Sequence, residues 1–126
     1  MATPDPPHDA DQLLAAVADA MSELHERYYH RPPGSTRCRF MGDDLLACVL
    51  GGVYTDVEKT LIELERAPLV HDSRNAFQTA MQDRFVSLVE RLAGRHVTHF
   101  VSTHSVGPDL EIELFFLGDP APAAGT

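Results

Sequence analysis

Histidine and cysteine are the residue types in this sequence that are best suited to chemistry. Three of the seven histidines, His96, His99 and His104, fall within one short stretch near the C-terminal end. In an extended strand His96 and His104 point to one side and His99 to the other, and their spacing matches no standard zinc signature. We therefore predict structural or surface histidines, no metal site and no cofactor.

The two cysteines are Cys38 and Cys48. A nucleophilic cysteine needs a nearby base and a lowered pKa, whereas a cysteine on a strand is by default buried and inert. In the hairpin register that we expect, Met41 lies opposite Asp44, and the two thiols then point to opposite faces of the sheet. This register predicts that they do not bond to each other.

A local basic cluster stands out in this acidic sequence and comprises His30, Arg31, Arg37 and Arg39. These groups suit a carboxylate, a phosphate or an acidic protein surface. Arginines that lie over apolar surface in a solvated loop would give the same pattern. His104 is placed near a turn, where it could join them in binding a ligand or an anion.

Catalysis is not indicated by any motif. The sequence shows no Ser/His/Asp order, no paired-carboxylate spacing and no cysteine cluster, so we expect that the protein is not an enzyme.

Helical periodicity marks three of the elements that must position these residues. Apolar residues recur at three- and four-residue spacing over 9–29, which predicts an amphipathic helix. Thr55 and Glu58 form a capping box that starts a short helix. A longer helix follows and ends near Gly94, a residue type that favours helix C-termini.

Two hairpins account for the rest of the ordered chain. The first covers 36–50 with a two-residue loop at Gly42 and Asp43, and the second covers 96–117 with its turn near Gly107. The order helix, hairpin, two helices, hairpin predicts an α+β fold. We expect a two-layer sandwich in which helices pack on one face of a four-stranded, mostly antiparallel sheet, with the strand order left open.

Length and charge limit the classes of protein and partner. The 126 residues fit one domain, which we expect over 9–117 between disordered ends at 1–8 and 118–126. A net charge of −9 repels nucleic acid and anionic lipid. The sequence contains neither a membrane-spanning apolar run nor a secretory signal, which indicates a cytoplasmic protein without direct membrane insertion.

The expected registers leave apolar side chains on both faces of the sheet. Phe100, Ile112, Leu114 and Phe116 would face the core. The outward face would carry Met41, Leu46, Leu50, Val101, Phe115 and Leu117. Such a patch indicates an interface, which we expect in a homodimer or with another partner, unless the N-terminal helix covers it. Arg37 and Arg39 against Glu111 and Glu113 would set the register of that interface.

Two segments resemble the MpsC-like domain family of small bacterial proteins. RCRFMGDDLLACVLGGVYTDVEKTL is similar to the family's core, and AGRHVTHFVSTHSVGPDLEIELFFL to its closing segment, so the resemblance spans about 13–117. At 30–34 a Gly-Arg-Gly-Pro-like run of the family is replaced by HRPPG. The resemblance implies an accessory role beside the membrane-transport proteins of a sodium-translocating system, and it supplies no catalytic residues.

These observations together favour a non-catalytic accessory or protein-interaction domain. The alternative is a small-molecule or anion-binding sensor domain, whose site would combine the loop at 30–34 with the turn at 104–109.

Overall fold

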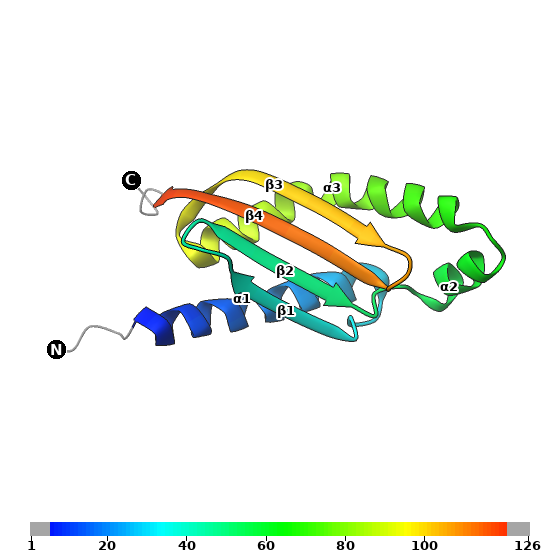
Figure 1. The fold of residues 1–126 in the computed structure, drawn as a ribbon, viewed down its shortest axis with the longest axis horizontal. Helices are drawn as coiled ribbons and strands as arrows, with labels where there is room; N and C mark the ends of the chain where they lie inside the picture. Colours follow the sequence, from blue (N-terminus) through cyan, green and yellow to red (C-terminus); the bar gives the residue numbers. More distant parts are fainter. Residues whose placement is uncertain (1–5, 121–126) are drawn as a thin grey trace.

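The fold is that of an α+β sandwich, and the computed structural model describes residues 6–120. Its element order confirms the predicted order of helices and strands, and the strands form one antiparallel sheet in the order β1-β2-β4-β3 (Figure 1). The elements are α1 (Pro6–Tyr29), β1 (Ser35–Phe40), β2 (Leu45–Gly51), α2 (Asp56–Glu63), α3 (Ala67–Ala93), β3 (Arg95–Ser105) and β4 (Leu110–Pro120).

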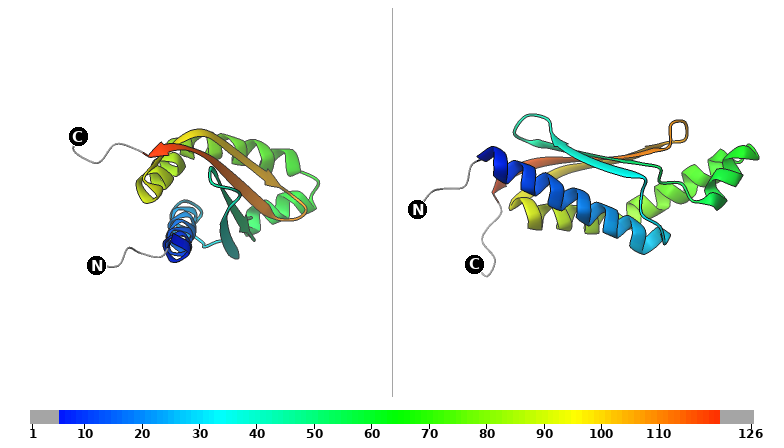
Figure 2. Two further views of the ribbon diagram at one scale, coloured as in Figure 1. Left: turned by 60° about the vertical axis from the view of Figure 1, so that its left-hand side comes forward. Right: turned by 90° about the horizontal axis from the view of Figure 1, so that it is seen from below.

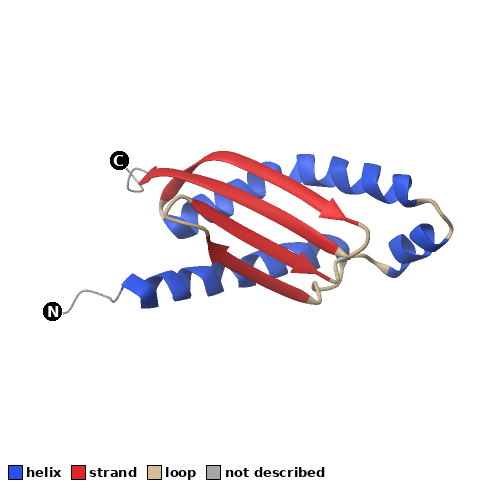
Figure 3. Cartoon of the chain, viewed as in Figure 1, coloured by secondary structure: helices blue, strands red, loops and turns tan. Residues whose placement is uncertain are grey.

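All three helices lie on one side of the sheet. The strands stand in front of the helices in Figure 3, and the view from below in Figure 2 places the helices together beneath the sheet. α1 packs against β1 and α3, and α3 packs against β3. The possibility that the N-terminal helix covers the opposite face is therefore wrong, and none of the described helices covers that face.

Local signals set several of the element boundaries. The hydroxyl of Thr55 accepts a hydrogen bond from the backbone of Glu58, and the Glu58 carboxylate accepts one from the backbone of Thr55, which confirms the capping box. Gly94 ends α3 in the left-handed conformation with φ of 66°. α1 begins at Pro6 and β4 extends to Pro120, so regular structure reaches beyond the expected 9–117. The rest of the two predicted disordered ends, 1–5 and 121–126, lies outside the described residues.

The first hairpin differs from its expected register by one residue. Cys38 lies opposite Cys48, and the backbone N–H of Met41 bonds to the carbonyl of Leu45, so the connection is longer than the expected two-residue loop. A slip of one residue moves every side chain of a strand to the other face. The longer connection turns Leu46 and Leu50 toward the helices, where their apolar surface is removed from water.

The faces of β4 are also the reverse of those expected. Phe115 and Leu117 are buried against the helices, whereas Phe116 lies on the open side and is only half-buried. The predicted interface residues Leu46, Leu50, Phe115 and Leu117 are therefore wrong, because all four belong to the core. Of the other two, Met41 is exposed and Val101 lies on the open side opposite Leu114.

Candidate functional site

The loops that were expected to form a ligand site do meet at one end of the sheet. Arg31 donates a hydrogen bond of 3.0 Å to the carbonyl of Tyr54. The Asp109 carboxylate accepts bonds from the backbone N–H groups of Val53, at 2.9 Å, and of Tyr54, at 3.3 Å. The Tyr54 hydroxyl donates to the Ser105 carbonyl at 2.7 Å. Because these polar groups form hydrogen bonds with one another, their role at this end of the sheet is to hold the loops together.

The other predicted ligand-binding residues lie elsewhere. His104 is on the helix-facing side of β3, and its Nε2 is 2.6 Å from Nδ1 of His71 on α3. Arg37 and Arg39 belong to edge strand β1 and point to the open side. His30 is exposed after the end of α1. The structure therefore separates the predicted residues and does not assemble them into one pocket.

The open side of the sheet carries a continuous apolar surface. Ala47 lies opposite Leu114, which lies opposite Val101, so one apolar row crosses three strands. All of these side chains are partly buried in the single chain, and none is fully buried. We define the open face as Leu45, Ala47, Val49, Val101, Ile112, Leu114 and Phe116.

Arginine borders this open face at β1. Arg37 and Arg39, together with Met41, line a hollow of about 350 Å³ that reaches Ala47 and Val49. Glu111 and Glu113 were expected to face these arginines across the sheet surface, but both are buried on the helix-facing side. The expected pairing of charges within one interface is therefore wrong, and the border of the open face is basic.

A buried ionic cluster occupies the helix-facing side. Arg74 of α3 is fully buried and forms ion pairs with Glu58, at 2.6 Å, and Glu111, at 3.2 Å. Its guanidinium carbon lies 4.1 Å from the ring centroid of Tyr29 and 5.0 Å from that of Tyr54. This cation joins α1, α2, α3 and β4, and hydrogen bonding to Glu58 raises its pKa against the effect of burial.

Glu113 lies on the same side of the sheet as Glu111 but forms no ion pair with any described residue. It is fully buried, and neither of its oxygens has a hydrogen-bond partner among the described residues. Burial, reinforced by the nearby charge of Glu111, raises its pKa to about 9. The Gln78 Nε2 atom and the Ser102 hydroxyl are likewise left without hydrogen-bond partners among the described residues. At neutral pH this carboxyl therefore keeps its proton.

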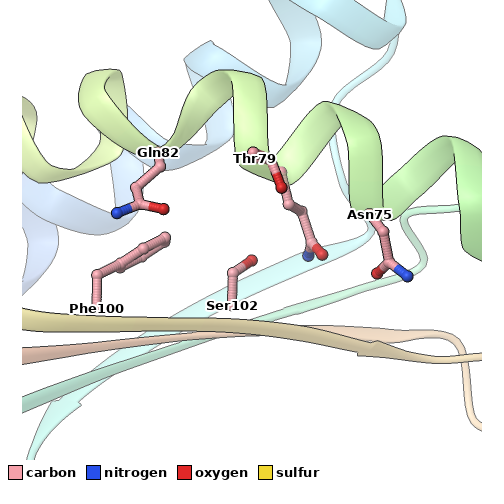
Figure 4. Close-up of a pocket in the computed structure, with 6 residues that line it drawn as sticks. Asn75, Thr79, Gln82, Phe100 and Ser102 are labelled. Atoms are coloured by element: carbon pink, nitrogen blue, oxygen red, sulfur yellow. The ribbon is translucent and has the colours of Figure 1, made fainter.

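A polar cleft of about 210 Å³ opens beside these groups, between α3 and β3. Figure 4 shows Asn75, Thr79 and Gln82 directed from α3 toward Phe100 and Ser102 on β3. Gln78 also lines the cleft. Amide and hydroxyl groups beside a neutral carboxyl suit an uncharged polar ligand, because none of the lining residues carries a charge to pair with an ion.

The described residues contain neither a metal-binding cluster nor a membrane-spanning helix. Within 6–120 no group of three or more His, Cys, Asp or Glu side chains is arranged to hold a metal ion. None of the three described helices combines the length and apolar character needed to cross a membrane.

The sequence prediction missed Arg74 and Gln78, and it placed Glu113 on the wrong face of the sheet. A signal for the first two was present, because both interrupt the apolar stripe of α3 at helical spacing from Val70 and Met81. A polar residue in such a stripe indicates a partner inside the fold, since its burial otherwise costs free energy. The signal for Glu113 was its place in an alternating pattern with Phe115.

Comparison with known proteins gives one match. The family model described as "Na+-translocating membrane potential-generating system (MpsC)" matches residues 9–119, which is most of the chain. Neither the curated proteins nor the solved structures contain a match.

Proposed function

We propose that this chain, which belongs to the MpsC family, is a non-catalytic accessory domain that acts by binding other proteins through its open face. The family description concerns a Na+-translocating membrane potential-generating system. In this proposal the domain works from the cytoplasm beside the membrane proteins of such a system. It docks by protein contacts, without inserting into the bilayer and without binding nucleic acid, which its net charge of −9 disfavours.

The open face is the observation that carries the proposal. It places aliphatic and aromatic side chains on the central strands β2 and β4, where a monomeric protein would normally carry polar residues. Contiguous apolar surface of this kind is typical of protein interfaces. The three described helices all pack on the other side of the sheet, so none of them covers it.

A second copy of the chain is the first partner in this proposal. Two sheets that pack face to face bury their apolar sides together, at a spacing of about 10 Å. A two-fold axis brings the same patch of both copies into contact, as in most homodimers. Arg37 and Arg39 then lie at the border of the interface, where their charges stay in contact with water.

Light scattering coupled to size-exclusion chromatography tests this interface. We expect a dimer for the wild type and a folded monomer for Phe116→Glu, because the new carboxylate would be buried without a partner in the dimer. Val57→Glu is the matched control, since Val57 is an exposed apolar residue of α2, far from the open face, and this variant should remain dimeric. A wild type that is monomeric at high concentration would contradict the homodimer.

A sensor domain is the second candidate function, and the cleft between α3 and β3 favours it. The unpartnered groups of Gln78, Ser102 and Glu113 lie beside that cleft and would gain hydrogen bonds from a ligand. A set of small uncharged amides, such as acetamide and propionamide, should then raise the melting temperature of the wild type. The stabilisation should be lost in Thr79→Val, and equal stabilisation of both proteins would exclude the cleft.

A further inference from the structure

The two cysteines form a cross-strand pair in the first hairpin. Cys38 of β1 lies directly opposite Cys48 of β2. Their Sγ atoms are 2.8 Å apart, and both side chains lie on the helix-facing side of the sheet. The one-residue change in register, which also buries Leu46 and Leu50, is what brings the two thiols together.

The position of the pair in the hydrogen-bond ladder suits a disulfide. The backbone bond from Met41 to Leu45 marks a hydrogen-bonded pair, and such pairs alternate along an antiparallel ladder. Cys38 and Cys48 therefore occupy a non-hydrogen-bonded pair, in which Cα atoms are about 4.5 Å apart. This separation lies within the range of about 4.4–6.8 Å that disulfides span, so the strands need not move apart or shift in register.

The two thiols differ in accessibility and in acidity. Cys38 is half-buried on an edge strand, whereas Cys48 is fully buried between two strands. The hydrogen bond between the two thiols lowers the pKa of Cys38, and the same bond, together with burial, raises the pKa of Cys48. Cys38 is thus the thiol that reacts first with a reagent. Cys48 is the neighbouring thiol that can displace the bound reagent from Cys38.

We propose that Cys38 and Cys48 form a reversible disulfide by exchange with a low-molecular-weight disulfide such as oxidised glutathione. The Cys38 thiolate attacks one sulfur of oxidised glutathione, a mixed disulfide forms, and one glutathione thiolate leaves. The Cys48 thiol then loses its proton and attacks the Cys38 sulfur. The second glutathione leaves and takes up that proton, so two electrons pass from the cysteines to glutathione.

The disulfide would link the edge strand β1 covalently to β2. β1 pairs with β2 alone, and it carries Arg37 and Arg39 at the border of the open face. A covalent link between β1 and β2 disfavours the opening of that hairpin. It keeps the two cysteines together in the opened chain as well, and so lowers the conformational entropy that opening would gain. The disulfide does not depend on the proposed homodimer, since both sulfurs belong to the same chain.

Mass spectrometry and thiol titration after incubation with oxidised glutathione test the proposal. The wild type should lose both thiols and two hydrogens of mass, with no bound glutathione and no link between chains, and reduced glutathione should reverse the change. Cys48→Ser should instead keep glutathione on Cys38, because the displacing thiol is absent. A stable glutathione adduct on the wild type, or two thiols that persist under conditions where Cys48→Ser reacts, would overturn the proposal.

Alkylation of the folded wild type provides a test that needs no variant. Iodoacetamide should modify Cys38 well before Cys48, as peptide mapping at successive times would show. Modification of Cys48 first would contradict the assignment of Cys38 as the attacking thiol. Protein that has been oxidised beforehand should resist alkylation at both positions.

Discussion

Arg74 and Glu58 form a two-point ion pair inside the protein. The Arg74 Nε donates to one carboxylate oxygen at 2.7 Å, and its Nη2 donates to the other at 2.6 Å. The same carboxylate accepts the backbone N–H of Thr55 at 2.9 Å. One side chain, Glu58, therefore both caps α2 and neutralises a buried cation of α3, which ties the start of the short helix to the middle of the domain.

Replacement of Arg74 should be strongly destabilising. Arg74→Met leaves Glu58 and Glu111 without their cation, and breaking a buried pair in this way typically costs about 3–5 kcal/mol. Urea denaturation should show a lower midpoint for this variant. Arg91→Met is the control, because Arg91 is exposed on the same helix and its loss should change the free energy of unfolding by about 0.5 kcal/mol or less.

Glu113 should make the protein less stable as the pH rises. Its pKa is about 9 in the folded state and 4.5 in its ordinary state, so the folded protein holds this proton more tightly. The contribution of this proton to the free energy of unfolding is fully present below about pH 4.5. It falls by about 1.4 kcal/mol per pH unit as the pH rises, and it is lost above about pH 9. Glu113→Gln, which carries no titrating proton, should remove this slope.

Urea denaturation of the two proteins at about pH 5.5 and about pH 8.5 measures this effect. The free energy of unfolding of Glu113→Gln, relative to that of the wild type, should be larger at the higher pH than at the lower pH. Glu26→Gln provides the control, since Glu26 is exposed on α1 and its replacement should leave the pH dependence of the wild type unchanged. Parallel pH profiles for wild type and Glu113→Gln would show that Glu113 is already ionised in the folded protein.

Substitution of Phe115 should cost the monomer more stability than substitution of Phe116. Phe115 is fully buried, with its ring centroid 5.0 Å from that of Phe100, and Phe115→Ala should cost about 3–5 kcal/mol of stability. Phe116→Ala, on the open face, should cost clearly less in the monomer and act mainly on the dimer. Thermal unfolding at low and high protein concentration separates the two effects, and equal losses for both variants would contradict the assignment of faces.

Gly52 should tolerate no side chain. Its φ is 63°, and an added Cβ would lie 3.2 Å from the backbone N and Cα of Gly34. The loops at 30–34 and 52–55 are joined there, because the Gly34 N–H bonds to the Gly52 carbonyl. Gly52→Ala should therefore lower the free energy of unfolding by about 1–3 kcal/mol. Denaturation with an unchanged midpoint would show that the two loops can separate freely.

Local sequence signals were sufficient for the elements and their order. The periodicity of α1 and α3 and the capping box at Thr55 depend on residues within a few positions of one another, as does the glycine that ends α3. The same kind of signal predicted both hairpins. The presence of one apolar face beyond the core also followed from alternation alone, although Val101 is the one predicted member that belongs to the open face.

Only the tertiary structure decided which side chains belong to which face. The first hairpin accommodates two registers that differ by one residue, and burial of Leu46, Cys48 and Leu50 against the helices selects one of them. On β4, the side that faces the helices includes Glu111, whose burial is compensated by Arg74, a residue far away in the chain. Alternation shows which residues of a strand share a face. It does not show which face packs against the helices, because that choice depends on contacts that form only when the layers pack.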